Sequence, residues 1–137
     1  MKKIFLLTFC LFIFNNISIA KETTFKKELF DKAQADGKIV IVSSWINYCT
    51  SCASQMKVLD KAKNDFDNIE YFKFEVTNKE IAQMFDVQYQ TTLLIFKNNE
   101  EVHRSIGQIE KDKIYSIIQS ALSVSYTHLT LPTKRIV

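Results

Sequence analysis

The apolar positions change their period along the chain, and this change predicts alternating strands and helices. Residues 38–45 contain the continuous apolar run Ile39–Val42, which is typical of a central strand covered on both faces. Residues 71–76 alternate between apolar and polar side chains, which indicates a strand with one buried face. Apolar side chains three and four residues apart instead predict helices, over residues 25–35, 52–66 and 109–122.

Turn and cap residues complete this pattern. Thr23 or Thr24 is expected to cap the first helix, and Thr77-Asn78 is expected to cap a short helix over residues 79–85. Asn98-Asn99 predicts a hairpin between a strand at 92–97 and a more polar strand at 101–106, which should lie at a sheet edge.

The predicted order of elements is α-β-α-β-α-β-β-α. Strands that alternate with helices and then end in a hairpin indicate an α/β fold with a mixed central sheet of about four strands and helices on both faces. In the helix at 52–66, Met56 falls on the predicted apolar stripe, and we expect it to pack in the core.

Both ends of the chain differ from this pattern. Residues 1–20 have two lysines, an apolar run from Ile4 to Phe14 and a small-x-small site at Ser18-Ile19-Ala20, which predicts a secretory signal peptide and a periplasmic or secreted protein. An uncleaved membrane anchor is the alternative, although the run is shorter than the roughly 20 residues that span a bilayer. Residues 124–137 are not periodic and resemble a translated sequencing adapter, so we expect a non-native tail there and a domain at residues 21–123.

Composition narrows the class of protein. The 137 residues suffice for one domain, and 47% hydrophobic and 24% charged residues are ordinary for a globular protein. The net charge of +3 is concentrated at the ends, because omitting Lys2, Lys3, Lys134 and Arg135 leaves 14 basic against 15 acidic residues. The body therefore has no basic stripe that would favour nucleic-acid binding.

The candidate chemistry lies in the pair Cys49 and Cys52, since the third cysteine, Cys10, falls in the predicted signal peptide. The pair follows a predicted strand and begins a predicted helix, whose N-terminus stabilises a thiolate. A disulfide ring this small removes little entropy from the unfolded chain, so a redox role is favoured over a structural cross-link.

Several further residues carry a resemblance to the thioredoxin superfamily, and to its exported members. Trp45 lies four residues before Cys49, Tyr48 directly before it, and Lys73 and Gly107 match a lysine near the site and a glycine before the last helix. Residues 85–96, which end in Thr-Leu-Leu-Ile-Phe, resemble the family segment that faces the cysteines, and they place Gln90 and Thr91 beside the site. The resemblance covers about residues 22–123.

Three positions depart from the family pattern. Thr91 stands where the family has a cis-proline, so the loop is expected to be either trans and reshaped or cis and strained. Ser43 replaces a buried acid six residues before the first cysteine, which leaves Lys73 without its usual partner. Thr50-Ser51 replaces Gly-Pro between the cysteines and adds hydroxyls without positive charge.

The resemblance implies an exported thiol–disulfide oxidoreductase that reduces protein disulfides as a monomer, without a cofactor or metal. Cys49 would attack the substrate, Cys52 would resolve the mixed disulfide, and a membrane partner would donate electrons. A second hypothesis is a binding module for a metal or a partner peptide, although the pair supplies two ligands, a structural zinc site takes four, and His103 falls on the predicted edge strand. A third is a structural domain with a permanent disulfide.

Overall fold

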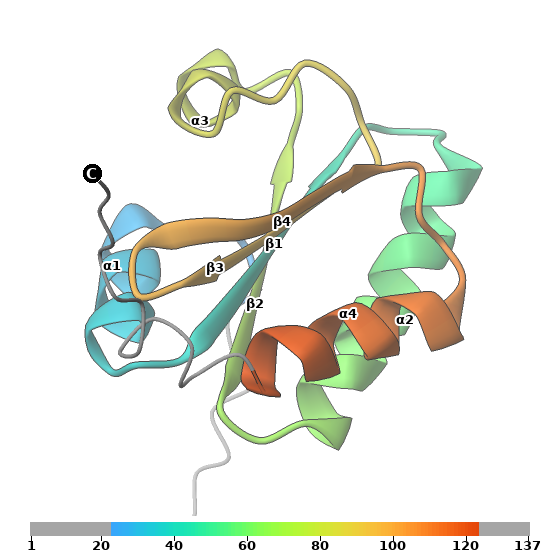
Figure 1. The fold of residues 1–137 in the computed structure, drawn as a ribbon. Helices are drawn as coiled ribbons and strands as arrows, with labels where there is room; N and C mark the ends of the chain where they lie inside the picture. The colour runs from blue at the N-terminus through green and yellow to red at the C-terminus, as the bar shows by residue number, and fades with distance from the viewer. Residues whose placement is uncertain (1–22, 124–137) are drawn as a thin grey trace, which may run out of the picture.

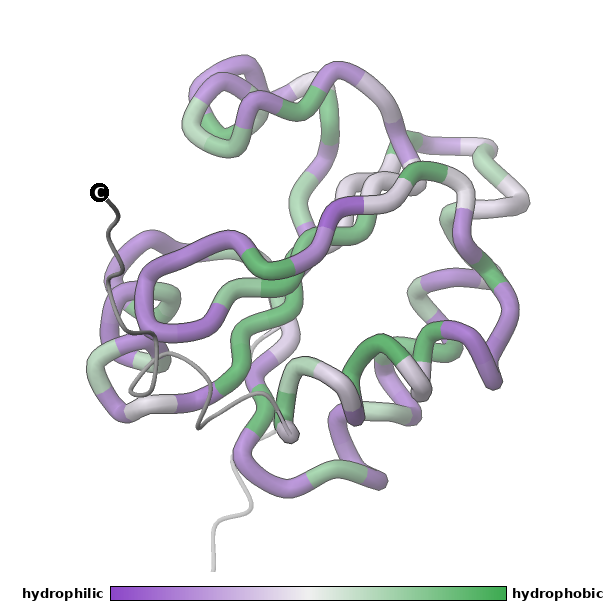
Figure 2. The backbone as a smooth tube through the Cα atoms, viewed as in Figure 1, coloured by the Kyte–Doolittle hydropathy of each residue, from purple (hydrophilic) through white to green (hydrophobic). Residues whose placement is uncertain are grey.

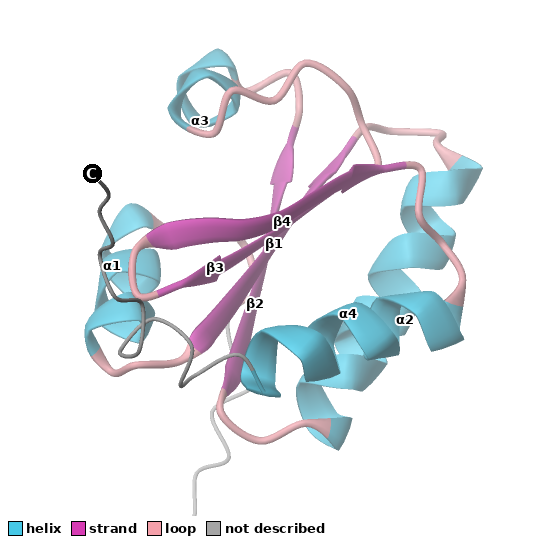
Figure 3. Cartoon of the chain, in the orientation of Figure 1, coloured by secondary structure: helices cyan, strands magenta, loops and turns pink. Residues whose placement is uncertain are grey.

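The structure, a computed structural model, describes residues 23–123; the predicted signal peptide and the predicted tail lie outside them. Within this range, four strands form one sheet and four helices cover it (Figures 1 and 3). The strands are β1 (Ile39–Trp45), β2 (Ile69–Glu75), β3 (Thr92–Lys97) and β4 (Glu100–Ile106). The helices are α1 (Lys27–Ala35), α2 (Thr50–Asp65), α3 (Lys79–Met84) and α4 (Lys111–Ser123). The predicted α/β fold with a four-stranded mixed sheet is confirmed.

The strand order is β2-β1-β3-β4, with β1 parallel to β2 and antiparallel to β3. The apolar run predicted to be central is central, because Ile39–Val42 is buried between two neighbouring strands. The polar strand β4 lies at the edge, as predicted, and Figure 2 shows it as more hydrophilic than β1. Asn98 and Asn99, with φ of 52° and 65°, form the predicted hairpin turn.

The sheet separates two hydrophobic layers. One layer, under α1 and α3, contains Phe25, Phe72, Phe85 and Phe96, and the other, under α2 and α4, contains Ile41, Leu59, Leu93 and Ile114. Alternate residues of each strand face opposite layers, which is why Phe72 and Tyr71 fall on different sides. No helix within residues 23–123 is both long and apolar enough to cross a membrane.

The start of the first helix differs from the prediction. The N-cap residue of α1 is Lys26, and no side chain in the described part of the chain caps this helix. The two threonines instead lie on extended backbone beside β2: the Phe25 N–H donates to the Lys73 carbonyl at 2.9 Å, and the Lys73 N–H donates to the Thr23 carbonyl at 2.7 Å. β-Branched residues favour such extended pairing, and tertiary contact outweighs the local cap signal here.

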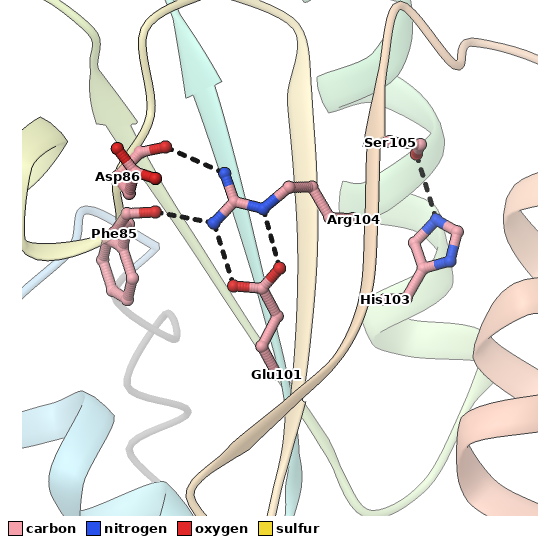
Figure 4. A network of polar contacts seen from close by, with 6 residues as sticks. All are labelled: Phe85, Asp86, Glu101, His103, Arg104 and Ser105. Atoms are coloured by element: carbon pink, nitrogen blue, oxygen red, sulfur yellow. Dashed lines mark hydrogen bonds and ion pairs between the residues drawn. The ribbon is translucent and has the colours of Figure 1, made fainter.

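The second predicted cap is present, and a further contact fixes the other end of the same helix. The Asn78 side chain accepts a hydrogen bond from the Ile81 N–H at the start of α3. At its end, the Arg104 guanidinium on β4 donates to the carbonyls of Phe85 and Asp86 at 2.7 and 2.9 Å and forms an ion pair with Glu101 (Figure 4). Arg104 thus satisfies carbonyls left free where α3 ends and ties the chain before Thr91 to the sheet.

Candidate active site at the Cys49–Cys52 pair

The two cysteines lie in the first turn of the helix that follows the central strand. Cys49 is the N-cap of α2 in an extended conformation, and its sulfur accepts a hydrogen bond from the Cys52 N–H at 3.2 Å. The helix therefore begins at Thr50, two residues earlier than predicted, so that both sulfurs lie at its N-terminus. The free N–H groups and the helix dipole at this end stabilise negative charge on a sulfur.

The pair forms a disulfide with unequal access to solvent. The Cα atoms are 5.3 Å apart and the sulfurs are bonded. Cys52 is 1% exposed, whereas Cys49 is partly exposed and lines an open hollow of about 520 Å³ with Trp45 and Met56. An incoming sulfur can reach Cys49 but not Cys52. The prediction that Met56 packs in the core is wrong, because this side chain is only half-buried and faces the hollow.

Thr91 brings a hydroxyl to both sulfurs from the loop before β3. Its Oγ1 lies 3.2 Å from the Cys52 Sγ, 3.6 Å from the Cys49 Sγ and 2.9 Å from the Ser51 Oγ. The Ser51 Oγ in turn lies 3.4 Å from the Cys49 Sγ. Of the two predicted conformations, the structure has the trans one, and Thr91 adopts the left-handed region at φ 59°. Such a backbone is uncommon for a β-branched residue and persists only where its surroundings hold it.

Three contacts to Thr91 and one to its neighbour Thr92 hold this backbone in place. Its N–H donates to the Ser44 carbonyl at 2.9 Å, and its carbonyl accepts from the Gly107 N–H at 2.9 Å and from the Gln55 Nε2 at 3.3 Å. The Ser44 Oγ also accepts the Thr92 N–H. Gly107 has φ 77°, which favours glycine, so the glycine matched by the sequence also positions the loop.

Gln55 is a site residue that sequence reasoning missed. It is fully buried on α2, and its Nε2 also donates to the Gln108 carbonyl at 2.8 Å, so one amide joins the loops before β3 and α4. Its Oε1 has no hydrogen-bond partner among the described residues. The sequence did offer a signal for it: Gln55 lies three residues after Cys52 and four before Leu59, so it shares their buried helix face.

Ser43, at the position where the resemblance implies a buried acid, pairs with a tyrosine. Its Oγ lies 2.8 Å from the Tyr71 hydroxyl, and both residues are buried. Burial raises the pKa of Tyr71, with the Ser43 hydrogen bond opposing the shift, so the tyrosine stays protonated at ordinary pH. Neither hydroxyl can act as the proton acceptor that a buried carboxylate would be.

The remaining predicted site residues line two separate hollows or lie on the loop that carries Thr91. Tyr48 is fully exposed with φ 62°, and it lines the hollow together with Thr50. Gln90 is exposed on the loop that carries Thr91. Lys73 lies on β2 beside Ser43 and lines a different hollow, which it shares with Trp45 and Phe25.

A metal site receives no support within residues 23–123. No group of three or more His, Cys, Asp or Glu side chains in this range could hold an ion. His103 lies on the edge strand, as predicted, and its Nε2 is 3.0 Å from the Ser105 Oγ (Figure 4). Among the described residues, the cysteine pair therefore finds no further side chains that would complete a four-ligand site.

A partly exposed sulfur joined to a buried one, at the start of a helix that follows a central strand, defines a two-cysteine thiol–disulfide redox site. Comparisons with known proteins agree: the Thioredoxin family model matches residues 17–120. Thioredoxin-1 of Saccharomyces cerevisiae is 30% identical over 79 residues, which are 57% of this chain and 77% of that protein. Thioredoxin of Mycoplasma genitalium is 29% identical over 84 residues, which are 61% and 82% of the two chains.

A solved structure shares the fold. The crystal structure of Trxlp from Edwardsiella tarda EIB202 superimposes with a TM-score of 0.64 at 28% identity, over 69% of this chain and 95% of that one. The chain belongs to the thioredoxin family, and it is a thiol–disulfide oxidoreductase.

Proposed function

We propose that this protein is an exported thioredoxin that reduces disulfide bonds in other proteins. The observation that carries the proposal is the unequal exposure of the two sulfurs: Cys49 borders an open hollow, and Cys52 is 1% exposed beneath it. A substrate sulfur can form a bond with Cys49, and only Cys52 is placed to displace it. This asymmetry supports Cys49 as the nucleophile and Cys52 as the resolving thiol.

The reaction starts from the reduced pair. The Cys49 thiolate attacks one sulfur of a substrate disulfide, a new S–S bond forms, and the other substrate sulfur leaves with the electron pair of the broken bond. The Cys52 sulfur then attacks Cys49, which closes the disulfide seen in the structure and releases the second substrate sulfur. The substrate gains two electrons and two protons, and the protein loses them.

The electrostatics of the site support reduction over strong oxidation. The Cys49 sulfur accepts the Cys52 N–H and lies at a helix N-terminus, but Thr50 and Ser51 between the cysteines carry no positive charge. Strong oxidants have a reduced form that is unusually stabilised. A thiolate stabilised by the helix end and by neutral hydroxyls, without a positive charge between the cysteines, favours a potential nearer to that of reducing members of the class.

Each turnover leaves the pair oxidised, so a second protein must supply electrons. If residues 1–20 direct export, the protein meets its substrates outside the reducing cytosol and requires an electron donor in the membrane. The proposal therefore includes disulfide-containing proteins as substrates and a membrane protein as the electron donor. It also includes a monomeric state and a periplasmic or secreted location for this protein. Fractionation of cells that express the full chain tests the location, and recovery in the cytosol with residues 1–20 intact would contradict it.

Activity is tested by insulin reduction with matched cysteine variants. Cys49→Ser should lose turnover by about three orders of magnitude or more, as expected for removal of a nucleophile. Cys52→Ser should lose turnover too but accumulate mixed disulfides through Cys49, because attack is intact and resolution is lost. These adducts appear on non-reducing gels and disappear with reductant.

The same pair of variants distinguishes the proposal from a binding module or a permanent structural disulfide. Full activity of Cys49→Ser, or adducts that form through position 52 in that variant, would overturn the assigned roles. An equal absence of adducts from both variants, together with no insulin reduction by the unmodified protein, would overturn protein disulfides as substrates.

A further inference from the structure

The protein carries two hydroxyls at its reacting sulfurs, in a region without a buried acid. The buried polar residues within 23–123 are neutral: Gln34, Ser43, Ser44, Gln55, Thr91 and Thr92. Yet Cys52 must lose a proton before it can attack Cys49, because the thiolate is the nucleophile. The polar side-chain atom at hydrogen-bond distance from the Cys52 sulfur in the described structure is the Thr91 Oγ1, at 3.2 Å.

From Thr91, a continuous chain of contacts leads toward solvent. The Thr91 Oγ1 lies 2.9 Å from the Ser51 Oγ, and the Ser51 Oγ lies 3.4 Å from the Cys49 Sγ. Thr91 is 3% exposed, whereas Ser51 is half-buried at the rim of the site. A hydroxyl accepts and donates at once, so each of the two can take a proton on one side and give one on the other.

We propose that Thr91 and Ser51 are catalytic residues that form a hydroxyl relay, which carries the proton of Cys52 outward while Cys52 resolves the mixed disulfide. The relay rests on the roles proposed above for Cys49 and Cys52. It explains why a threonine at position 91 is held in a left-handed backbone by contacts from Ser44, Gln55 and Gly107: they fix its hydroxyl between the two sulfurs and Ser51.

The step balances in atoms and electrons. Cys52 S–H gives its proton to Thr91 Oγ1, Thr91 gives its own proton to Ser51 Oγ, and Ser51 gives its own to the departing substrate sulfur or to water. The electron pair freed on Cys52 forms the Cys49–Cys52 bond, and the pair of the broken bond leaves with the substrate sulfur. Both hydroxyls end neutral, and no alkoxide is required. The same path run backward protonates Cys52 when a substrate is oxidised.

A two-phase kinetic experiment isolates this step. Fully reduced Cys10→Ser protein, which keeps only the site pair, is mixed with Ellman's reagent. The first burst of released aromatic thiolate reports attack by Cys49, and the second reports resolution by Cys52. The second-phase rate is measured from pH 6 to pH 9.5 for Thr91→Ala, Thr91→Ser, Ser51→Ala and the double variant Thr91→Ala/Ser51→Ala.

The relay predicts a pH-dependent loss with rescue. At pH 6, Thr91→Ala should slow the second phase by roughly a hundredfold or more, as expected for loss of a positioned proton-transfer group. Above about pH 9, where free thiols ionise without help, its rate should approach that of the parent. Thr91→Ser should keep the parent profile, and the double variant should be no slower than the slower single variant, because both residues act in one chain.

Other results would overturn the relay. One such result is a Thr91→Ala rate profile equal to that of the parent at every pH. Another is a slowing of Thr91→Ala that is the same at every pH and also occurs in Thr91→Ser, because that result would indicate altered loop geometry. Additive losses in the double variant would show that the two hydroxyls act separately. If the parent itself shows no second phase, the proposed roles of the cysteines fail first; a normal parent with unaffected variants removes the relay alone.

Discussion

The two layers on either side of the sheet are built from different side chains. Under α1 and α3, six phenylalanines contact one another: Phe25, Phe30, Phe72, Phe74, Phe85 and Phe96. Phe85 lies at the centre, with ring centroids 5.1 Å from Phe25 and 5.5 Å from both Phe30 and Phe96. Tilted and edge-to-face pairs of this kind add to the free energy gained by burial.

The layer under α2 and α4 is mainly aliphatic, although Phe66 and Tyr115 pack against it, and it includes polar groups. Ser43 and Tyr71 form a buried hydroxyl pair there, and Gln55 takes a helix position that an apolar residue could fill. Gln55 holds the Thr91 carbonyl, which places the Thr91 hydroxyl at the sulfurs. The comparison teaches that ring packing dominates the layer under α1 and α3, while the layer under α2 and α4 gives up apolar packing at Gln55 to position the redox site.

Phe85→Ala is expected to have the largest effect on stability of the substitutions that test this difference between the two layers. It should lower the free energy of unfolding by about 3–5 kcal/mol, because it leaves a cavity among the packed rings. The reduction potential of the Cys49–Cys52 couple should stay unchanged, since the substitution lies across the sheet from α2. Urea unfolding of oxidised protein measures the first quantity; Phe85→Leu, which keeps most of the volume, is the control and should lose less than Phe85→Ala.

Gln55→Met tests the opposite layer. Methionine keeps the volume but leaves the carbonyls of Thr91 and Gln108 without their side-chain donor, which should reduce stability by about 1–3 kcal/mol. Unlike Phe85→Ala, this variant should also slow disulfide exchange, because the loop that carries the Thr91 hydroxyl loses an anchor. A stability loss with unchanged exchange kinetics would show that Gln55 serves the core alone.

Tyr71→Phe probes the buried hydroxyl pair. Removing one partner strands the Ser43 hydroxyl and should lower stability by about 1–2 kcal/mol. Adding Ser43→Ala should recover part of this loss, because a pair replaced by apolar groups on both sides leaves no stranded atom. Urea unfolding of both single variants and the double variant gives the coupling free energy. Strictly additive losses would contradict a direct hydrogen bond.

The smallest expected effect concerns the edge strand. Burial lowers the pKa of His103 below its usual 6.5, against a smaller upward effect from Glu101. The unfolded chain therefore binds a proton at higher pH than the folded chain, so stability is full above about pH 6.5 and falls as the pH drops below it. His103→Gln should lose less stability than the unmodified protein between pH 7.5 and pH 5. An identical loss in both proteins would remove His103 as the cause.

Periodicity predicted the sheet well because burial decides it. The unbroken Ile39–Val42 run has one explanation in a small α/β domain, and the polar strand could lie only at an edge. Cap signals were less decisive: Asn78 caps α3, but Thr23 and Thr24 pair with β2 instead, a choice that depends on a strand nearly 50 residues later.

The site was harder to predict in detail than the fold. Cys49, Cys52 and Thr91 were expected together, and the structure brings them together. Helical spacing could not choose between Gln55 and Met56 for the buried face, because that choice depends on the rotation that buries Cys52. The left-handed backbone of Thr91 depends on contacts from Ser44, Gln55 and Gly107, which are far apart in sequence.

The central claim is that the Cys49–Cys52 disulfide opens and closes as part of the protein's activity. The most direct test is the reduction potential of this couple, measured by equilibrating Cys10→Ser protein in defined thiol–disulfide buffers and trapping free thiols for mass spectrometry. The account predicts a reversible two-electron couple between about −270 and −180 mV, the range of thioredoxins and related exchange proteins. A potential below about −300 mV, typical of structural disulfides, would contradict it.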